Sequence, residues 1–145
     1  MLRRLAWICV IAACGSTAPA PVPPVEPARR DPPATAADLA ILQRADEILA
    51  SPAVWNRHDT RDCPEDARTW SLYCALERAT IEVAGAREHR GVALQEVRFA
   101  IDDAMRGVEL HHRLMDYNNL ATTRFEDIKR VIAVALERVR ARIER

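Results

Sequence analysis

Apolar residues recur every three or four positions in four stretches of the chain, and this spacing limits the fold more than any other feature. Such a repeat places the apolar side chains on one face of an α-helix. The repeats consist of Leu39, Leu42, Ala45 and Leu49, of Leu72, Leu76, Ala79 and Val83, of Leu94, Val97, Ile101, Met105 and Val108, and of Ile128, Ile132, Ala135, Val139 and Ile143. No stretch alternates convincingly between apolar and polar residues as a strand does. The chain is therefore predicted to be all-α, a small antiparallel bundle of about four helices.

The first helix is bounded by recognisable start and stop signals. Thr35 and Asp38 stand at the spacing of a short-armed capping box, so the helix should begin at Thr35. Ser51, followed by a proline, should end it. Residues 53–68 then show no apolar period and are predicted to be an ordered loop.

The next two helices follow from the same signals. The second should cover about residues 70–84, with Thr69 as its N-cap and Gly85 as its C-terminal stop. The third should cover about residues 92–114, where Gly107 is able to bend the helix or to end it early. Short connections between these elements favour antiparallel neighbours.

The last helix is expected after a break in the pattern. Residues 116–119 (Asp-Tyr-Asn-Asn) are rich in types that favour turns, so a turn is predicted there. Thr123 and Glu126 form a full capping box, which should open a helix that runs to about Ile143. The predicted helical domain therefore spans residues 35–145, a usual size for one domain.

Prolines crowd the region before the first helix. Residues 15–34 hold seven of the nine prolines of the chain and show no apolar repeat. Such a segment cannot bury enough apolar surface to fold, and proline favours the extended polyproline II conformation. Residues 14–34 are therefore predicted to be a disordered linker. At about 3 Å per residue it would span up to roughly 60 Å, as a semi-stiff tether in preference to a polyproline ligand.

The N-terminus combines a short basic stretch, an apolar run and a cysteine. Two arginines precede nine apolar residues, 5–13, a run that suits a secretory signal and is too short to span a bilayer. The sequence Ile-Ala-Ala-Cys at 11–14 resembles the bacterial lipobox. The resemblance implies a lipoprotein signal peptide over residues 1–13, cleavage before Cys14, and diacylglycerol on that cysteine.

The same resemblance implies a location. A lipid anchor at Cys14 would make the membrane a partner and would hold the protein in a bacterial cell envelope. Residues 15–16 (Gly-Ser) lack the aspartate that often signals retention in the inner membrane of proteobacteria. The outer membrane, on its periplasmic side, is therefore expected.

The four cysteines divide into separate roles. Cys9 would be lost with the signal peptide, and Cys14 would be acylated. Cys63 and Cys74 remain, and in a chain exported to an oxidising compartment they are predicted to form a disulfide. A metal pair or two free thiols are the alternatives.

Charge and motifs exclude several classes of function. After loss of the two N-terminal arginines the chain would carry 19 basic and 21 acidic residues. It therefore lacks the excess of positive charge that nucleic-acid binding requires. The sequence contains no dinucleotide fingerprint, phosphate-binding loop, zinc-protease helix or glycine-flanked nucleophilic serine. We therefore expect no nucleic-acid partner and no cofactor, and the chain leans away from an enzyme.

Polar and aromatic residues gather in the loop after the first helix and in the turn before the last one. A His beside an Asp serves acid–base chemistry when a nucleophile is in reach, so a cleft between the two segments would bind or hydrolyse a small ligand. The structural alternative is that the tryptophans shield the disulfide and the asparagines satisfy backbone groups of the turn. The candidate binding residues are Trp55, His58, Asp59, Tyr117 and Asn118.

A pair of adjacent histidines is the only feature that suggests a metal. His111 and His112 would point about 100° apart on a helix and would not bind one ion together. His112 and Asp116 stand four residues apart and are able to face a common ion, with Glu109 or His89 as a third ligand. A closed zinc site requires four ligands, commonly at recognisable spacings, and the sequence contains no such cluster. No metal ligand is therefore assigned.

Scattered residues over about positions 40–140 resemble a small helical family of unknown function found in bacteria and phages. This chain differs from the family pattern at Asn119, where Asp is usual, and at Glu77, where Gly is expected. The family implies no activity, so no catalytic residue is carried over. The resemblance rests on Trp55, Cys63, the run Trp70-Ser71-Leu72-Tyr73-Cys74-Ala75-Leu76, Ala79, Tyr117-Asn118-Asn119, Thr123, Asp127 and Ile128.

The sequence therefore predicts a lipid-anchored envelope protein with a non-enzymatic binding or structural role. Its expected partner is an unidentified envelope protein or component. A small-ligand-binding or hydrolytic domain with a cleft near His58, Asp59, Tyr117 and Asn118 is the first alternative. A metal-binding envelope protein is the second.

Overall fold

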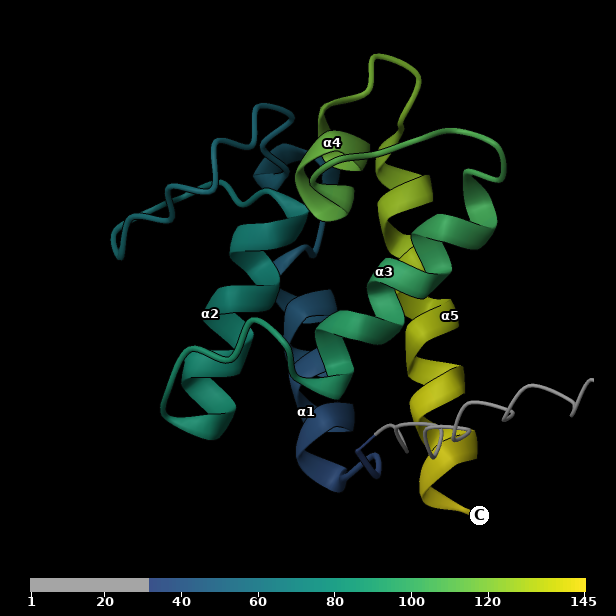
Figure 1. Ribbon diagram of the computed structural model, residues 1–145. Coiled ribbons are helices and arrows are strands. Elements are labelled where there is room, and N and C mark those ends of the chain that lie inside the picture. Colours follow the sequence, from purple (N-terminus) through teal and green to yellow (C-terminus); the bar gives the residue numbers. More distant parts are fainter. Residues whose placement is uncertain (1–31) are drawn as a thin grey trace, which may run out of the picture. The chain divides into compact units, whose positions relative to one another are not determined.

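Five α-helices and one short 3₁₀ turn make up the part of the chain that the computed structural model describes, residues 32–145 (Figure 1). The signal peptide predicted over 1–13 and most of the linker predicted over 14–34, with Cys14, lie outside the described residues. Within them there is no strand, and the prediction of an all-α bundle is confirmed. The elements are α1 (Ala36–Ile48), the 3₁₀ turn (Pro52–Val54), α2 (Leu72–Ala84), α3 (Val92–Ala104), α4 (Arg113–Asn119) and α5 (Phe125–Ile143).

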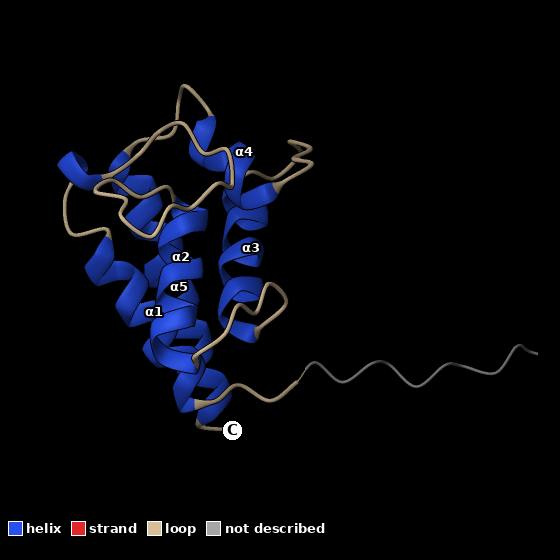
Figure 2. Cartoon of the chain, turned by 90° about the vertical axis from the view of Figure 1, so that its left-hand side faces the viewer, coloured by secondary structure: helices blue, strands red, loops and turns tan. Residues whose placement is uncertain are grey.

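Four of the helices form the bundle and the fifth closes one end. Figure 1 shows α1 and α3 running one way along the bundle, and α2 and α5 running the opposite way. The short helix α4 and the loop between α1 and α2 lie together at the end opposite to the C-terminus (Figures 1 and 2). None of the described helices is both long and apolar enough to cross a membrane.

The predicted apolar repeats form most of the core. The side chains that lose nearly all contact with solvent include Leu42, Leu49, Leu72, Leu76, Leu94, Val97, Ile101, Ile128, Ile132 and Val139. Complete burial of one such side chain contributes roughly 1.5–3 kcal/mol. The exposed residues of the repeats are the last ones of three of them, Val83, Val108 and Ile143.

The start of α1 agrees with the sequence, and the start of α2 does not. Thr35 accepts a hydrogen bond from the backbone N–H of Asp38 (3.3 Å) and donates its own N–H to that carboxylate (2.9 Å), as a capping box requires. The expected N-cap of α2, Thr69, is wrong. Ser71 takes this place instead, and its Oγ accepts from the N–H of Cys74 (3.2 Å).

The shift has a local cause in the backbone of Trp70. Its N–H donates to the carbonyl of Val54 (2.7 Å), and its carbonyl accepts from the N–H of Asn56 (2.9 Å). These two bonds hold Trp70 in an extended bridge to the preceding loop, so the helix starts only after it. Gly85 ends α2 with a φ of +76°, as expected from its position.

The third predicted helix is two helices separated by a turn. The helix α3 ends at Ala104 and Gly107 follows with a φ of +84°, so the extension to residue 114 is wrong and the early stop is correct. The turn predicted at residues 116–119 is also wrong, since these residues lie in α4. Burial explains the difference, because Leu114, Tyr117 and Asn118 stand at helical spacing and all face the interior.

The last helix begins two residues after the predicted cap. The capping carboxylate of α5 belongs to Asp127, which accepts from the N–H of Arg124 (3.0 Å), so the predicted box of Thr123 and Glu126 is wrong. The hydroxyl of Thr123 has another partner, the carbonyl of Tyr117 (2.7 Å). Thr123 thus holds the turn between α4 and α5.

Candidate functional site

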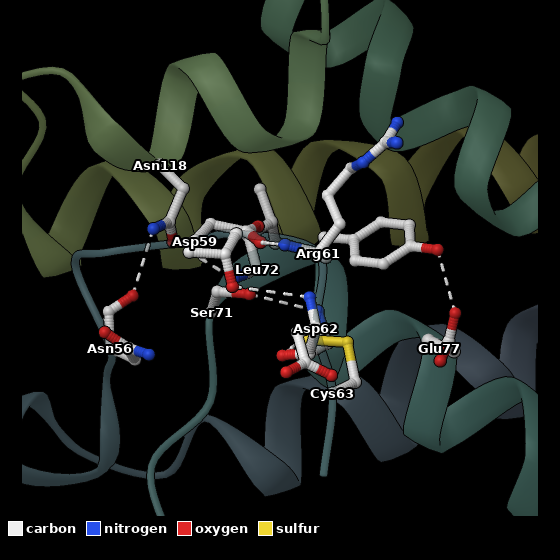
Figure 3. The surroundings of a disulfide bond; sticks show 12 residues. Asn56, Asp59, Arg61, Asp62, Cys63, Ser71, Leu72, Glu77 and Asn118 are labelled. Carbon is white, nitrogen blue, oxygen red and sulfur yellow. Dashed lines mark hydrogen bonds between the residues drawn. A yellow bond between two sulfur atoms is a disulfide. The ribbon is translucent and has the colours of Figure 1, made fainter.

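The loop between α1 and α2 is attached to α4 by one buried amide. Asn118 has no exposed surface, and its Oδ1 accepts hydrogen bonds from the indole N–H of Trp55 (2.8 Å) and the backbone N–H of Leu72 (3.0 Å). Its Nδ2 donates to the carbonyl of Asn56 (3.0 Å). Figure 3 shows this side chain above the loop and the start of α2. All three contacts are made to groups of the loop and of the start of α2, so the role of Asn118 is to position the loop.

A second asparagine fixes the next part of the loop. Asn119 accepts from the N–H of Asp59 (2.7 Å) and donates to its carbonyl (2.9 Å). The buried carboxylate of Asp59 then accepts from the N–H of Arg61 (2.7 Å) through Oδ1, while Oδ2 has no hydrogen-bond partner in the described chain. The backbone is therefore held from Asp59 to Arg61.

The disulfide holds the loop at the following position. Cys63 and Cys74 are bonded, with their Cα atoms 5.3 Å apart, which confirms the predicted pair and joins the loop to α2 (Figure 3). A hollow of about 280 Å³ beside the bond is lined by His58, Asp59 and Ser71, among others.

The structure brings some of the predicted candidate residues together but not all of them: Trp55 is hydrogen-bonded to Asn118, while His58 lies beside Asp59 in another hollow. His58 is exposed and Asp59 lines the hollow beside the disulfide, but Tyr117 and Asn118 do not line it. Tyr117 is buried, its hydroxyl donates to the carbonyl of Asp127 (3.5 Å), and burial raises the pKa of the phenol.

Two further candidates have structural contacts. The Trp55 ring packs 6.1 Å from the Phe125 ring, and the guanidinium of Arg57 lies 5.1 Å above the indole. The backbone N–H of His112 donates to the carboxylate of Asp116 (2.8 Å), a contact within one helical turn. Among residues 32–145 no three His, Cys, Asp or Glu side chains are grouped so as to hold a metal ion.

A larger hollow, of about 460 Å³, lies where α2, α3 and α4 meet two loops, and we call it the basic cleft. Its volume falls within the usual range of small-molecule sites. The charged residues that line it are all basic or ionisable to a cation: Arg61, Arg90, Arg98, Arg113, His89, His111 and His112.

The wall of the cleft on α2 is a tyrosine with two polar contacts. The Tyr73 hydroxyl donates to the buried carboxylate of Glu77 (2.8 Å) and lies 3.1 Å from Nδ1 of His89, whose ring stacks on the phenol at 6.1 Å. Burial, and then the hydrogen bond to Glu77, raise the pKa of Tyr73 to about 12. Tyr73 therefore stays neutral at physiological pH.

The wall on α3 is an arginine that has no acidic partner among residues 32–145. Arg98 is partly buried, and its Nη1 donates to the carbonyl of His89 (3.0 Å) and to Oε1 of Gln95 (2.7 Å). Burial and then the neighbouring charge of Arg113 lower the pKa of Arg98. Arg113 itself pairs with Asp102 (2.8 Å).

The loop contributes Arg61 in an unusual backbone conformation. Arg61 has a φ of +61°, the one positive φ outside glycine in the described chain. This region costs a side-chain-bearing residue about 1–2 kcal/mol. The contact with Asp59 and the disulfide at Cys63 hold it there, and Figure 3 shows the Arg61 side chain extending away from the disulfide.

The basic cleft could not be predicted from the sequence, because its residues come from five separate segments. The nearest signals were two short basic stretches, His89-Arg90 between α2 and α3, and His111-His112-Arg113 at the start of α4. Comparison of the chain with protein-family models, curated proteins and solved structures found no match.

Proposed function

We propose that this chain is a lipid-anchored protein of the bacterial envelope that binds another envelope component without catalysis. The lipobox-like sequence at Cys14 supports the anchor, and the proline-rich segment after it supports a tether. The proposed location is the outer membrane, facing the periplasm.

The observation that carries the binding role is the basic cleft. It brings four arginines from separate segments to one hollow, and none of the described residues that line it is an acid. Hydrogen bonds hold the side chains of Tyr73, Arg98 and Arg113 in place, so this part of the cleft is formed before a ligand arrives. A preformed site loses less conformational entropy on binding.

The anchor is tested by replacing the acylated residue. The mature protein should partition into the detergent phase, and Cys14→Ala should leave the signal peptide uncleaved. A Cys14→Ala chain that is still cleaved and still held at the membrane would contradict the lipoprotein proposal. Fractionation of the two membranes then tests the outer-membrane location.

The binding role is tested by photo-crosslinking in intact cells. A photoreactive residue at His111, exposed on the rim of the cleft, should give crosslinked adducts that mass spectrometry identifies. The matched control is the same residue at Val134, exposed on α5 outside the cleft. Equal adducts at both positions, or none at His111, would contradict binding at the cleft.

A second candidate function concerns the hollow beside the disulfide. Asp59 is buried there with one carboxylate oxygen unpartnered in the described chain, next to His58. This observation favours a small-ligand-binding or hydrolytic role for that hollow. Asp59→Asn should abolish such an activity against generic ester substrates, and a chain with no such activity would remove this candidate.

A further inference from the structure

We infer that the basic cleft is an oxyanion site that binds a phosphate monoester. The inference rests on the proposed binding function and adds to it the chemical class of the ligand. Arg61, Arg98 and Arg113 are the residues that would hold the phosphate, one from the loop, one from α3 and one from α4.

The charge of the cleft is local and is not a property of the whole domain. Residues 32–145 carry 17 basic and 19 acidic residues, so the domain is slightly acidic when its histidines are neutral. The cleft nevertheless gathers four guanidinium groups, of which only Arg113 has an acidic partner in the described chain. Like charges held together repel, and an anion between them removes that repulsion.

Arg98 has the donors that an oxyanion needs. Both of its hydrogen bonds in the described chain leave from Nη1, to the carbonyl of His89 and to Gln95. The N–H groups of Nε and Nη2 remain without a protein partner there, and together they form the planar fork that binds two oxygens of one phosphate or carboxylate. The contact with Gln95 fixes the orientation of this fork before the ligand binds.

Arg61 adds a second guanidinium at a structural cost. A glycine would adopt a φ of +61° without strain, yet an arginine stands at this position of the loop. Asp59 and Cys63 on either side hold the backbone in place. A strained residue that delivers a charge to a cleft is typical of a binding site.

The number of cations favours phosphate over a single carboxylate. Three guanidinium groups from three segments suit a dianion with several oxygens, whereas one carboxylate would satisfy one fork. The hollow of about 460 Å³ also leaves room for an organic group on the phosphate. A soluble phosphate monoester and a phosphomonoester lipid headgroup share this chemistry.

The test is calorimetric titration of the full chain, purified in neutral detergent, with glycerol phosphate and with acetate. The wild type should bind glycerol phosphate saturably and at least tenfold more tightly than acetate. Arg98→Gln and Arg61→Gly should each weaken phosphate binding about tenfold or more. Arg61→Gly also relieves the strained backbone, so this variant should keep its fold.

The matched control is Arg68→Gln, an exposed arginine of the same loop that does not line the basic cleft. It should keep its affinity within about twofold, since an exposed charge outside the cleft is screened by salt. Equal weakening in Arg68→Gln and Arg98→Gln would show general charge attraction and would overturn the site. Acetate binding as tight as phosphate binding would overturn the ligand class.

A second titration distinguishes the two sources of phosphate. Phosphatidic acid added to the micelles should compete with glycerol phosphate if the cleft takes a lipid headgroup, and should have no effect if it takes a soluble ester. Absence of binding to both would overturn the inference.

These results separate the inference from the proposed function. Crosslinks at His111 without any phosphate binding would leave the binding role standing and would remove its ligand class. Phosphate binding by a Cys14→Ala chain would leave the inference standing whatever the fate of the anchor.

Discussion

Asn118 shows how much of this domain depends on single polar side chains. Three of its four hydrogen bonds join α4 to the loop and to the start of α2, and it is completely buried. Thr123 and Asn119 act in the same way on neighbouring turns. Each occupies a position where the sequence suggested a cap or a turn. The two asparagines join segments distant along the chain, whereas Thr123 closes the turn between α4 and α5.

Removal of the Asn118 amide should be among the most damaging polar substitutions. Asn118→Ala leaves the indole N–H of Trp55, the N–H of Leu72 and the carbonyl of Asn56 without their partner. Each unsatisfied buried group costs about 1–3 kcal/mol, so we expect the free energy of unfolding in urea to fall by about 3 kcal/mol or more.

The control for this substitution is Asn56→Ala. Within the described residues the Asn56 side chain accepts only the N–H of His58, in an exposed turn, so its loss should cost less than about 1 kcal/mol. Similar losses in the two variants would argue against the role assigned to Asn118.

The two tyrosines of the chain give a prediction on pH. Burial raises the pKa of both phenols, that of Tyr73 to about 12, above the ordinary value of 10.0. A raised pKa means that the neutral phenol stabilises the fold; this contribution is complete below pH 10 and is lost as the pH rises towards about 12. Tyrosinate absorbance of the folded chain should therefore show no step at the ordinary pKa, whereas the chain in urea should titrate there. A normal step in the folded chain would contradict the burial of the phenols.

At the scale of elements, the connection between α3 and α4 depends on a glycine. Gly107 has a φ of +84°, and a side chain at this position would meet no atom within 4 Å. Backbone strain is therefore the only cost of Gly107→Ala, about 1 kcal/mol. Thermal unfolding should detect it as a lower midpoint.

Gly91 provides the comparison for Gly107→Ala. Its φ of −59° is open to any residue, and only the flexible side chain of Glu88 lies close, at 3.3 Å. Gly91→Ala should therefore lower the midpoint less than Gly107→Ala, and the reverse order would contradict the account of the turn.

The four apolar repeats were sufficient to predict the bundle, because each repeat faces one common core. The helix α4 escaped prediction, since its residues favour turns and only the burial of Leu114 and Tyr117 makes them helical. The cap of α5 was misplaced because the Thr123 hydroxyl donates to the carbonyl of Tyr117 in α4 instead of capping α5. The basic cleft has no local pattern at all, since Arg61 and Arg113 meet only in the folded chain.

At the scale of the whole molecule, one disulfide joins the loop to the bundle. The bond closes a short segment, with Cys63 and Cys74 separated by 11 positions. It also lies two residues beyond Arg61, so it affects the geometry of the basic cleft. Stability and binding are therefore expected to depend on the same bond.

Reduction of the disulfide should lower both the free energy of unfolding and the affinity for glycerol phosphate. A closed segment of this length stabilises the fold by about 3 kcal/mol in the chain-entropy account. Urea unfolding with and without dithiothreitol should show a loss of this order, and Cys63→Ser should reproduce it in the absence of reductant. Glycerol phosphate should bind the reduced chain more weakly, whereas unchanged affinity would show that Arg61 is held by Asp59 alone.

The position of this bond also implies an order of events, in which the disulfide forms after export and the basic cleft is completed after that. Thiols stay reduced in the bacterial cytoplasm and become oxidised after export. A precursor still in the cytoplasm would therefore hold Arg61 loosely and compete little for the abundant phosphate compounds there. In the proposed exported protein, oxidation would complete the cleft only after the chain had left those compounds behind.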